Sequence, residues 1–378
     1  METTRPSVER NLALDTIRAI ATLMIVAYHI FYWQNYTDSH PSGLGAFTRR
    51  LDAGVALFFT LSGYLLFRPF VVALFANSEL PNIKTFYLKR ATRIFPGYWV
   101  ALITLALIDA IQIPNASVFI RKFFLIQSWR SLEVFTGIVQ SWTLSVEICF
   151  YFLLPLISLF FSSLIRDKST HTKVQIIGFG LLFLFVLSWL YRILQISDNT
   201  WFPANLDTLV LGMFIAFFVE IPESTKRVGW IKEILSKFSP LLALLSFICW
   251  FLSACIGLPV ELKNGSLVIE LLGHFLYAIS AFIFMIPFCL QNRQSRLVRL
   301  FSLRPLAWIG KISYGIYIWH MLFLQGNFST KHFFYTSGSG LLQPFIIILP
   351  TSIAIATLSY YIVELPIMRF MSRRLASK

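Results

Sequence analysis

Charged residues are scarce in this sequence. Only 13% of its 378 residues are Asp, Glu, Lys or Arg, whereas 57% are hydrophobic and the mean hydropathy is +0.70. Soluble globular domains carry about 25% charged residues, so this composition excludes a soluble domain of the same length. The longest polar stretches, around 34–53, 77–95 and 114–140, are too short to form a separate domain.

Cysteine is also rare, and several reactive motifs are missing. The four cysteines all lie within or beside apolar runs, without a CxxC pair or a histidine at metal-ligand spacing. We therefore expect no zinc or other metal site and no disulfide framework. No GxSxG motif occurs, which excludes a serine hydrolase of that type. No internal repeat is visible either, and this disfavours the inverted-repeat architecture of many transporters.

Long apolar runs are abundant. Because they are continuously apolar and do not alternate with polar residues, they favour helices over a barrel. We predict an all-α membrane protein with about ten transmembrane helices, whose chemistry takes place in or at the membrane. The predicted spans are 12–33, 54–76, 96–113, 142–164, 174–195, 203–220, 239–258, 267–290, 306–327 and 341–365.

The surplus of Lys and Arg gives a formal net charge of +14, a balance that is also typical of nucleic-acid-binding proteins. Their positions favour another interpretation. If the N-terminus is cytoplasmic, the tails and loops on that side hold 21 Lys and Arg and the opposite loops hold 8. This asymmetry is the positive-inside pattern. We predict that both termini are cytoplasmic, that residues 367–378 form a basic cytoplasmic tail, and that nucleic acid is not a partner.

The first span, "LALDTIRAIATLMIVAYHIFYW" (Leu12–Trp33), carries three ionisable residues. Each costs about 2.5 to 3.5 kcal/mol in a membrane and usually faces a bundle interior or a wet cavity. Eleven residues separate Arg18 from His29, which places both within about 20° of one helix face and about 16 Å apart. Asp15 is close enough to pair with Arg18. The helix thus has a cation at its cytoplasmic end and an imidazole near mid-membrane.

Each of these residues has two interpretations. Arg18 either contacts lipid phosphates, as Arg does at span ends, or binds an anionic ligand. His29 either forms a hydrogen bond to a neighbouring helix, or acts as a neutral general base or nucleophile in a cavity.

The second span contains "FFTLSGYLLFRPF", with Ser62, and the loop behind it contains "LKRATRIFPGYW". In this loop Arg90 and Arg93 are three residues apart, beside Lys89. Together with Arg18 they form a cationic group that could bind the phosphates of a nucleotide cofactor. The alternative is ordinary positive-inside charge that contacts anionic lipid.

Two more spans carry buried polar residues. In "SWTLSVEICFYFLLP", Ser145 and Glu147 lie deep in an apolar run, where Glu147 must either be protonated or meet an Arg or His from another helix. In "GKISYGIYIWH", polar residues at i, i+4 and i+7 form one stripe, which serves either for hydrogen bonds between helices or as the wall of a substrate cavity. The stripe consists of Ser313, Tyr317 and His320, with Tyr314 adjacent.

Two further apolar segments carry charged residues. "SVFIRKFFLIQSW" (Ser117–Trp129) is apolar but short and is interrupted by Arg121 and Lys122, so we interpret it as an interfacial or re-entrant helix. "YYIVELP" closes the tenth run with Glu364 two residues before Pro366. We interpret this as a helix-ending proline and an interfacial carboxylate without a functional role.

As an ordered set, these blocks resemble the acyltransferase-3 family of integral-membrane O-acyltransferases. The resemblance covers about residues 12–366, and it departs at Thr16, where Gly is usual, and at Ile148 and Cys149, where an acidic residue and Gln are common. The matching blocks are "LDTIRAIATLMIVAYH", "FFTLSGYLL", Arg90-x-x-Arg93, "WTLSVEICFY", "ISYGIYIWH" and "YYIVELP".

The resemblance implies a ten-helix bundle in a bacterial plasma membrane. It would move an acyl group, usually acetyl, from cytoplasmic acyl-CoA to a hydroxyl of an envelope glycan, a glycolipid or a small product. Carried over by motif, His29 and Glu147 would be catalytic, and Arg18, Arg90 and Arg93 would surround the CoA phosphates. The residues expected to bind substrate or support the centre are Asp15, Ser62, Ser145, Tyr314, Tyr317 and His320.

Two expectations concern the rest of the protein. Some members of the family carry an extra soluble hydrolase-like domain after the bundle, whereas this sequence ends at Lys378 without one. We expect residues 1–378 to form a single domain that completes the transfer alone. The rival interpretation is a proton-coupled transporter, because intramembrane His and Glu also serve in proton relays.

Overall fold

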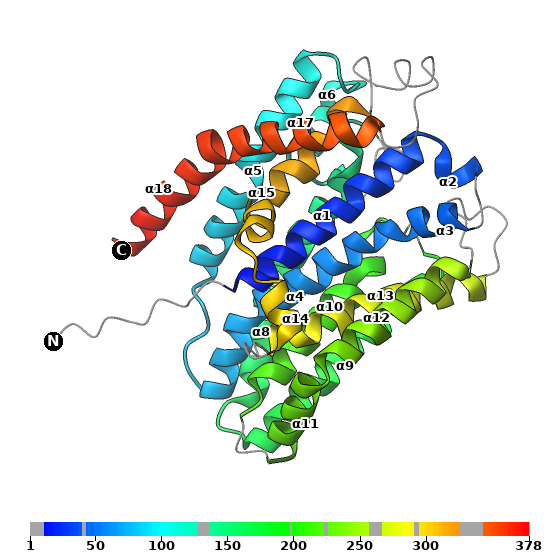
Figure 1. Cartoon of the computed structure of the whole chain (residues 1–378). Helices are drawn as coiled ribbons and strands as arrows, with labels where there is room; N and C mark the ends of the chain where they lie inside the picture. The colour runs from blue at the N-terminus through cyan, green and yellow to red at the C-terminus, as the bar shows by residue number, and fades with distance from the viewer. Residues whose placement is uncertain are drawn as a thin grey trace.

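The computed structural model describes residues 11–39, 43–127, 136–196, 199–222, 226–256, 267–290, 295–324 and 343–377. These residues form a bundle of long helices, and no strand occurs among them (Figure 1). The prediction of an all-α membrane protein is confirmed.

Every predicted apolar run contains a long helix. The ten helices are α1 (Leu12–Trp33), α4 (Gly54–Ala76), α5 (Ile83–Leu107), α8 (Trp142–Ile165), α9 (Thr170–Ile193), α10 (Phe202–Glu220), α12 (Ser239–Cys255), α13 (Leu267–Cys289), α15 (Arg304–Trp319) and α17 (Gln343–Ser359). Shorter elements are α2 (Tyr36–Ser39), α3 (Leu44–Arg49), η1 (Arg50–Ala53), α6 (Ala116–Phe123), η3 (Val139–Ser141), α11 (Lys226–Lys237), α14 (Arg296–Leu300), η5 (His320–Phe323), the π-helical turn η7 (Tyr360–Glu364) and α18 (Leu365–Ala376).

Fewer than ten of these helices meet the requirements for a membrane span. Within the described residues, seven helical segments are long and apolar enough, and an eighth is added if α11 and α12, which meet at a bend of 73°, count as one span. The helix α15 is too short, because its 16 residues reach only about 24 Å. The helix α5 is long enough, but its first half is strongly basic.

The loop predicted for 77–95 is wrong from Ile83 onward. The helix α5 begins there because Asn82 caps it: the Asn82 side chain accepts a hydrogen bond from the backbone N–H of Thr85 (2.9 Å). Lys and Arg are good helix formers, but they lower the hydropathy of a segment. This half of the helix therefore does not appear as an apolar run in the sequence. As a result, Arg90 and Arg93 lie one turn apart on a helix.

Glycines bring several pairs of helices into backbone contact, among them α4 with α10 and α1 with α15. A Cβ added to Gly63 of α4 would lie 1.9 Å from the Leu209 carbonyl oxygen, and one added to Gly212 of α10 would lie 1.9 Å from that of Thr60. A Cβ on Gly310 of α15 would lie 1.7 Å from the Asp15 carbonyl oxygen of α1. Small residues allow such close crossings in membranes. The crossing fixes α1, which carries His29, against α15, whose C-terminal end is directly followed by His320.

The α4–α10 crossing gives a stability prediction. We expect Gly212→Ala to destabilise the folded protein by about 3 kcal/mol or more, because the backbone of α4 cannot move away from the new methyl group. Thermal unfolding of the detergent-solubilised protein would measure the effect. The matched control is Gly229→Ala on α11, where no atom lies within 4 Å of the added Cβ. Equal melting temperatures for the two variants would contradict the prediction.

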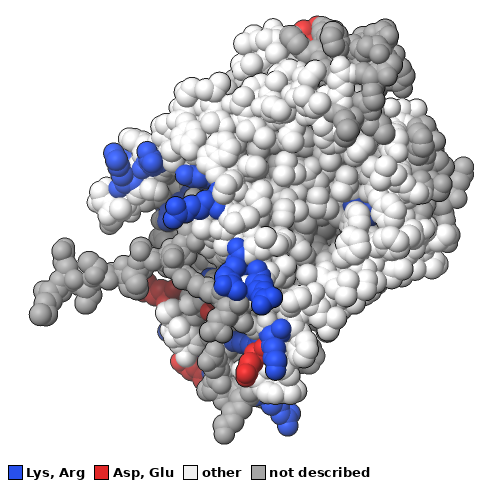
Figure 2. All heavy atoms as spheres, in the orientation of Figure 1, with Lys and Arg blue, Asp and Glu red and all other residues white. Residues whose placement is uncertain are grey.

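Basic side chains gather on one side of the molecule. On the face shown in Figure 2, Lys and Arg lie around α18, α14 and α11, and the other side of this face is almost free of charge. The helix α1 begins near the basic side and ends away from it (Figure 1). The cytoplasmic location of this side stays a prediction. Four residues that contribute to the predicted asymmetry, Arg5, Arg10, Arg293 and Lys378, lie outside the described residues.

The segment Ser117–Trp129 and the end of the tenth apolar run are also partly helical. In the segment Ser117–Trp129, the helix α6 packs on α5: Tyr98 donates to the Lys122 carbonyl oxygen (3.0 Å), and the Trp99 indole donates to that of Phe123 (2.9 Å). Residues 128 and 129 lie outside the described residues. After α17, the chain continues through η7 into α18, which forms most of the predicted basic tail.

Candidate active site

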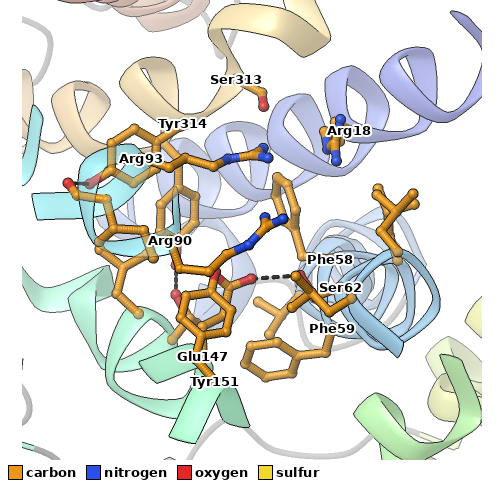
Figure 3. A pocket seen from close by; sticks show the side chains of 18 of the residues that line it. Arg18, Phe58, Phe59, Ser62, Arg90, Arg93, Glu147, Tyr151, Ser313 and Tyr314 are labelled. Atoms are coloured by element: carbon orange, nitrogen blue, oxygen red, sulfur yellow. Dashed lines mark hydrogen bonds between the residues drawn. The ribbon is translucent and has the colours of Figure 1, made fainter. Parts of the chain in front are cut away.

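A pocket lies among α1, α4, α5, α8 and α15, and three arginines line it. Arg18 comes from α1, and Arg90 and Arg93 come from consecutive turns of α5. Figure 3 shows their guanidinium groups pointing into the same space. The empty space, including the part that opens to solvent, is about 810 Å³.

The three arginines differ in their ion pairs. Arg18 pairs with Asp15 (2.8 Å), as predicted, and this carboxylate holds it in place. Among the described residues, no carboxylate oxygen lies within 4.0 Å of Arg90 or Arg93. The buried Nε of Arg90 has no hydrogen-bond partner there, and its guanidinium lies over the Phe86 ring. The pocket therefore offers positive charge and free N–H donors to an anion.

Glu147 lines this same pocket and is held by two hydroxyl groups. Its Oε1 accepts a hydrogen bond from Ser62 (2.6 Å) and its Oε2 accepts one from Tyr151 (2.9 Å). Ser62 was a predicted site residue. Tyr151 was not, although its position one turn after Glu147 on the same helix face was a signal that could have found it. The carboxylate thus belongs to the arginine pocket.

The rest of the pocket wall is apolar. Branched and aromatic side chains from α1, α4 and α8 make a lining suited to an uncharged chain or acyl group. They are Ile25, Val55, Phe58, Phe59, Leu61, Leu65, Leu66 and Leu144.

The polar stripe of α15 serves both purposes that the sequence left open. Ser313, Tyr314 and Tyr317 all line the pocket. The Tyr314 hydroxyl donates to the Ile94 carbonyl oxygen of α5 (2.5 Å), and the Tyr317 hydroxyl lies 2.8 Å from Thr143 Oγ1 of α8. The stripe therefore forms one wall of the pocket while its hydroxyl groups tie α15 to the neighbouring helices.

Gln140, which the sequence gave no reason to select, clamps the end of α15. The side-chain Nε2 of Gln140 donates to the backbone carbonyl oxygens of Tyr317 and Ile318, both at 3.0 Å. The backbone carbonyl oxygen of Gln140 accepts a hydrogen bond from the Tyr317 hydroxyl (2.9 Å). Its side chain is 1% exposed. The clamp fixes the turn of α15 that directly precedes His320.

His29 and His320 form a pair just beyond the pocket. His29 Nδ1 and His320 Nε2 are 3.0 Å apart, and the rings are stacked with centroids 5.0 Å apart. Neither residue lines the pocket, but the residues one turn earlier on each helix, Ile25 and Tyr317, do. Along α1, His29 lies only four residues before the C-terminal end at Trp33. The pair is therefore at the helix ends that point away from Arg18.

Besides the histidine pair, two predicted site residues do not line the pocket. Asp15 does not line the pocket and contacts Arg18, which does. The Ser145 hydroxyl is buried and has no hydrogen-bond partner among the described residues, and the side chain does not line the pocket. The structure thus brings together Arg18, Ser62, Arg90, Arg93, Glu147, Tyr314 and Tyr317, with His29 and His320 next to them.

The interpretation of Glu364 as an interfacial carboxylate is wrong. The residue is only 3% exposed and accepts a hydrogen bond from Ser359 (3.1 Å). It lies against Tyr314 and Gly97, because a Cβ on Gly97 would be 3.1 Å from the Tyr314 ring and 3.2 Å from Glu364 Oε1. The cause is the π-helical turn η7, which shifts the helix register and turns the carboxylate inward.

A second buried polar cluster lies where α9, α10 and α13 meet, away from the pocket. Asp207 Oδ2 and His274 Nε2 are 2.6 Å apart; the Asp207 side chain is buried, and that of His274 is 11% exposed. Arg192 donates to the Asn199 side chain (2.9 Å) and to the Ala204 carbonyl oxygen. The cluster ties the three helices together. The sequence prediction did not include this cluster, although its ionisable residues within apolar runs were a signal for it.

Comparison with known proteins decides the family. The family model described as "Acyltransferase domain", of the acyltransferase-3 type, matches residues 11–364. The chain belongs to the acyltransferase-3 family. The match includes every residue of the pocket and the histidine pair, so the resemblance found in the sequence motifs is confirmed. No solved structure matches the chain.

Several bacterial relatives have named activities. The chain is 26% identical over 341 residues to peptidoglycan O-acetyltransferase OatA of Listeria monocytogenes, covering 84% of this chain and 50% of the relative. It is 24% identical over 394 residues to "Putative peptidoglycan O-acetyltransferase YrhL" of Bacillus subtilis, covering 96% and 56%. The chain of this acyltransferase-3 protein therefore spans about half the length of the curated relatives it matches.

Proposed function

We propose that this acyltransferase-3 protein is a membrane O-acetyltransferase that uses acyl-CoA, most simply acetyl-CoA, as its donor. The observation that carries the proposal is the convergence of Arg18, Arg90 and Arg93 on one pocket whose far wall leads to the His29–His320 pair. Membership of an acyltransferase family and bacterial relatives named as O-acetyltransferases support it.

The donor chemistry fits the lining of the pocket. CoA carries phosphates at one end and a thioester at the end of a long thin arm. Guanidinium groups bind phosphate with forked N–H donors, and the apolar wall accepts the arm. Arg18 and His29 are eleven residues apart on α1, about 16 Å along the axis, which leaves room for an extended arm between them.

His29 has the chemistry for the transfer itself. It either takes the proton from the acceptor hydroxyl while the acceptor oxygen attacks the thioester, or it accepts the acetyl group first and passes it on. In this proposal Glu147 holds Ser62 and Tyr151 in place beside the arginines, and its effect on catalysis is indirect.

For the acceptor we propose a hydroxyl of an envelope carbohydrate. The relatives named above act on peptidoglycan according to their names. With the basic side of the bundle in the cytoplasm, the histidine pair lies toward the opposite face of a bacterial plasma membrane, where envelope glycans are found. The donor and the acceptor would then approach the site from opposite sides.

Labelled acetyl-CoA tests the proposal directly and separates it from the proton-coupled transporter. We expect the purified protein in detergent to release free CoA thiol and to label soluble peptidoglycan fragments. Thiol release without labelling of these fragments would retain the donor and redirect the search for the acceptor to other glycans. A protein that is inactive toward acetyl-CoA in detergent, but moves protons or solutes in sealed vesicles, would overturn the proposal.

A further inference from the structure

The contacts of His320 show which of its ring nitrogens carries the hydrogen. Its Nδ1 lies 3.2 Å from the carbonyl oxygen of Ile316, one turn earlier on α15. A carbonyl oxygen only accepts hydrogen bonds, so this contact is a hydrogen bond only if Nδ1 carries the hydrogen. In a neutral imidazole the other nitrogen then bears a lone pair. For His320 that nitrogen is Nε2, which faces His29.

The contact between the two rings shows which nitrogen of His29 carries the hydrogen. Its Nδ1 is 3.0 Å from His320 Nε2, and one hydrogen must lie between these two nitrogens for a bond to form. Because His320 Nε2 supplies the lone pair, the hydrogen belongs to His29 Nδ1. The remaining ring nitrogen of His29, Nε2, is then left with a lone pair and no hydrogen.

The surroundings favour neutral rings in both positions. His320 is 0% exposed, and the neighbouring Ile316 and Met321 belong to a buried apolar cluster. Among the described residues, no carboxylate oxygen lies within 4.0 Å of either ring. An imidazolium ion at His320 would be a buried charge without a counter-ion, which is costly, and one at the half-buried His29 would have no carboxylate beside it either.

We propose that His320 is a positioning residue that fixes the tautomer of His29 and so makes His29 Nε2 the reactive nitrogen. The consequence for the reaction rests on the proposed function; the tautomer itself does not. In the transfer, Nε2 takes the proton of the acceptor hydroxyl, the hydroxyl oxygen bonds to the acyl carbon, and the carbon–sulfur bond of the thioester breaks to release the thiolate. The same lone pair is the nucleophile if His29 carries the acyl group.

The clamp at the end of α15 makes such positioning possible. Gln140 forms hydrogen bonds with the carbonyl groups of Tyr317 and Ile318 and with the Tyr317 hydroxyl, so three hydrogen bonds fix the turn before His320. His320 does not line the pocket. Substitutions at His320 should therefore change the chemical step and leave donor binding intact.

Three variants of the full-length protein in detergent separate the two nitrogens of His320. Gln places its amide oxygen where Nε2 was and retains an acceptor for His29 Nδ1–H. Asn reaches only the position of Nδ1, so it retains the contact with Ile316 and loses the one with His29. Leu loses both. Loss of tautomer control in a serine-protease triad costs about 10⁴ in kcat. We expect His320→Asn and His320→Leu to lose at least about 100-fold in kcat for CoA thiol release, with KM for acetyl-CoA unchanged, and His320→Gln to remain within about tenfold of the wild type.

Nitrogen-15 NMR of histidine-labelled protein tests the tautomer without any assay of activity. His29→Asn identifies the His29 signals by their loss. We expect a protonated Nδ1 and an unprotonated Nε2 for His29 in the wild type and in His320→Gln, and a mixture of tautomers in His320→Asn. A protonated Nε2 in the wild type, or full kcat in His320→Asn, would overturn the inference. If the tautomer is as expected but the wild type does not use acetyl-CoA, the proposed function fails and the positioning role stands.

Discussion

His29→Ala should abolish acetyl transfer while the protein still inserts and folds. We expect kcat for CoA thiol release to fall by about 10² to 10⁴, the range that a positioned general base contributes. The structural reason is that the pocket leads, one helical turn further along the chain from Ile25 and from Tyr317, to an imidazole whose Nδ1 lies 3.0 Å from His320 Nε2. The measurement is thiol release from acetyl-CoA by the purified variant.

The control for this prediction is His171→Ala at the start of α9. His171 is exposed and does not line the pocket, so its removal tests for a general effect of losing a histidine. Both variants should elute like the wild type in size-exclusion chromatography. Wild-type turnover by His29→Ala would remove His29 from the mechanism and leave the pocket without its proposed base.

Replacement of the arginines should act on the donor and not on the chemical step. We expect Arg90→Ala and Arg93→Ala each to raise KM for acetyl-CoA by about tenfold or more, because each removes a charge-assisted hydrogen bond worth about 1.5 to 3 kcal/mol. Arg18→Ala should have a similar effect and also leaves Asp15 without its ion pair. Steady-state kinetics as a function of acetyl-CoA concentration would measure these changes.

Acetyl-dephospho-CoA, which lacks the 3′-phosphate, shows whether the arginines act on phosphate. The wild type should use it less well than acetyl-CoA, and a variant that lacks the arginine on that phosphate should no longer distinguish the two donors. Arg166→Ala, an exposed arginine after α8, is the matched control and should keep the wild-type KM. An unchanged KM in all three pocket variants would show that the phosphates bind elsewhere.

The individual residues of the site could be found in the sequence because they break a strong rule. An ionisable or polar side chain inside an apolar run must be paired or face a cavity, and this marked Arg18, His29, Glu147 and His320. Helical periodicity further grouped Ser313 with Tyr317 and His320. These expectations depend only on local spacing, and the structure places most of these residues on or next to one pocket.

Contacts between distant segments could not be found in this way. Gln140 is an ordinary residue in a predicted loop, and its importance comes from hydrogen bonds to a helix that lies 177 residues later in the chain. Glu364 appeared interfacial because the π-helical turn that turns it inward is not visible in the hydropathy pattern. The start of α5 was missed because its Lys and Arg residues lower the hydropathy, although the same residues favour a helix.

The sequence by itself determined the class of the protein: an all-helical membrane bundle, the positions of its long apolar helices, its basic side and the polar residues that need a partner inside a membrane. These follow from the cost of placing each residue in a membrane, which is a local property. Only the tertiary structure decided that three arginines from two helices share one pocket with Glu147, and that His29 meets His320 across 291 residues. Their distances depend on the close crossing of α1 and α15 at Gly310, and no single helix contains that information.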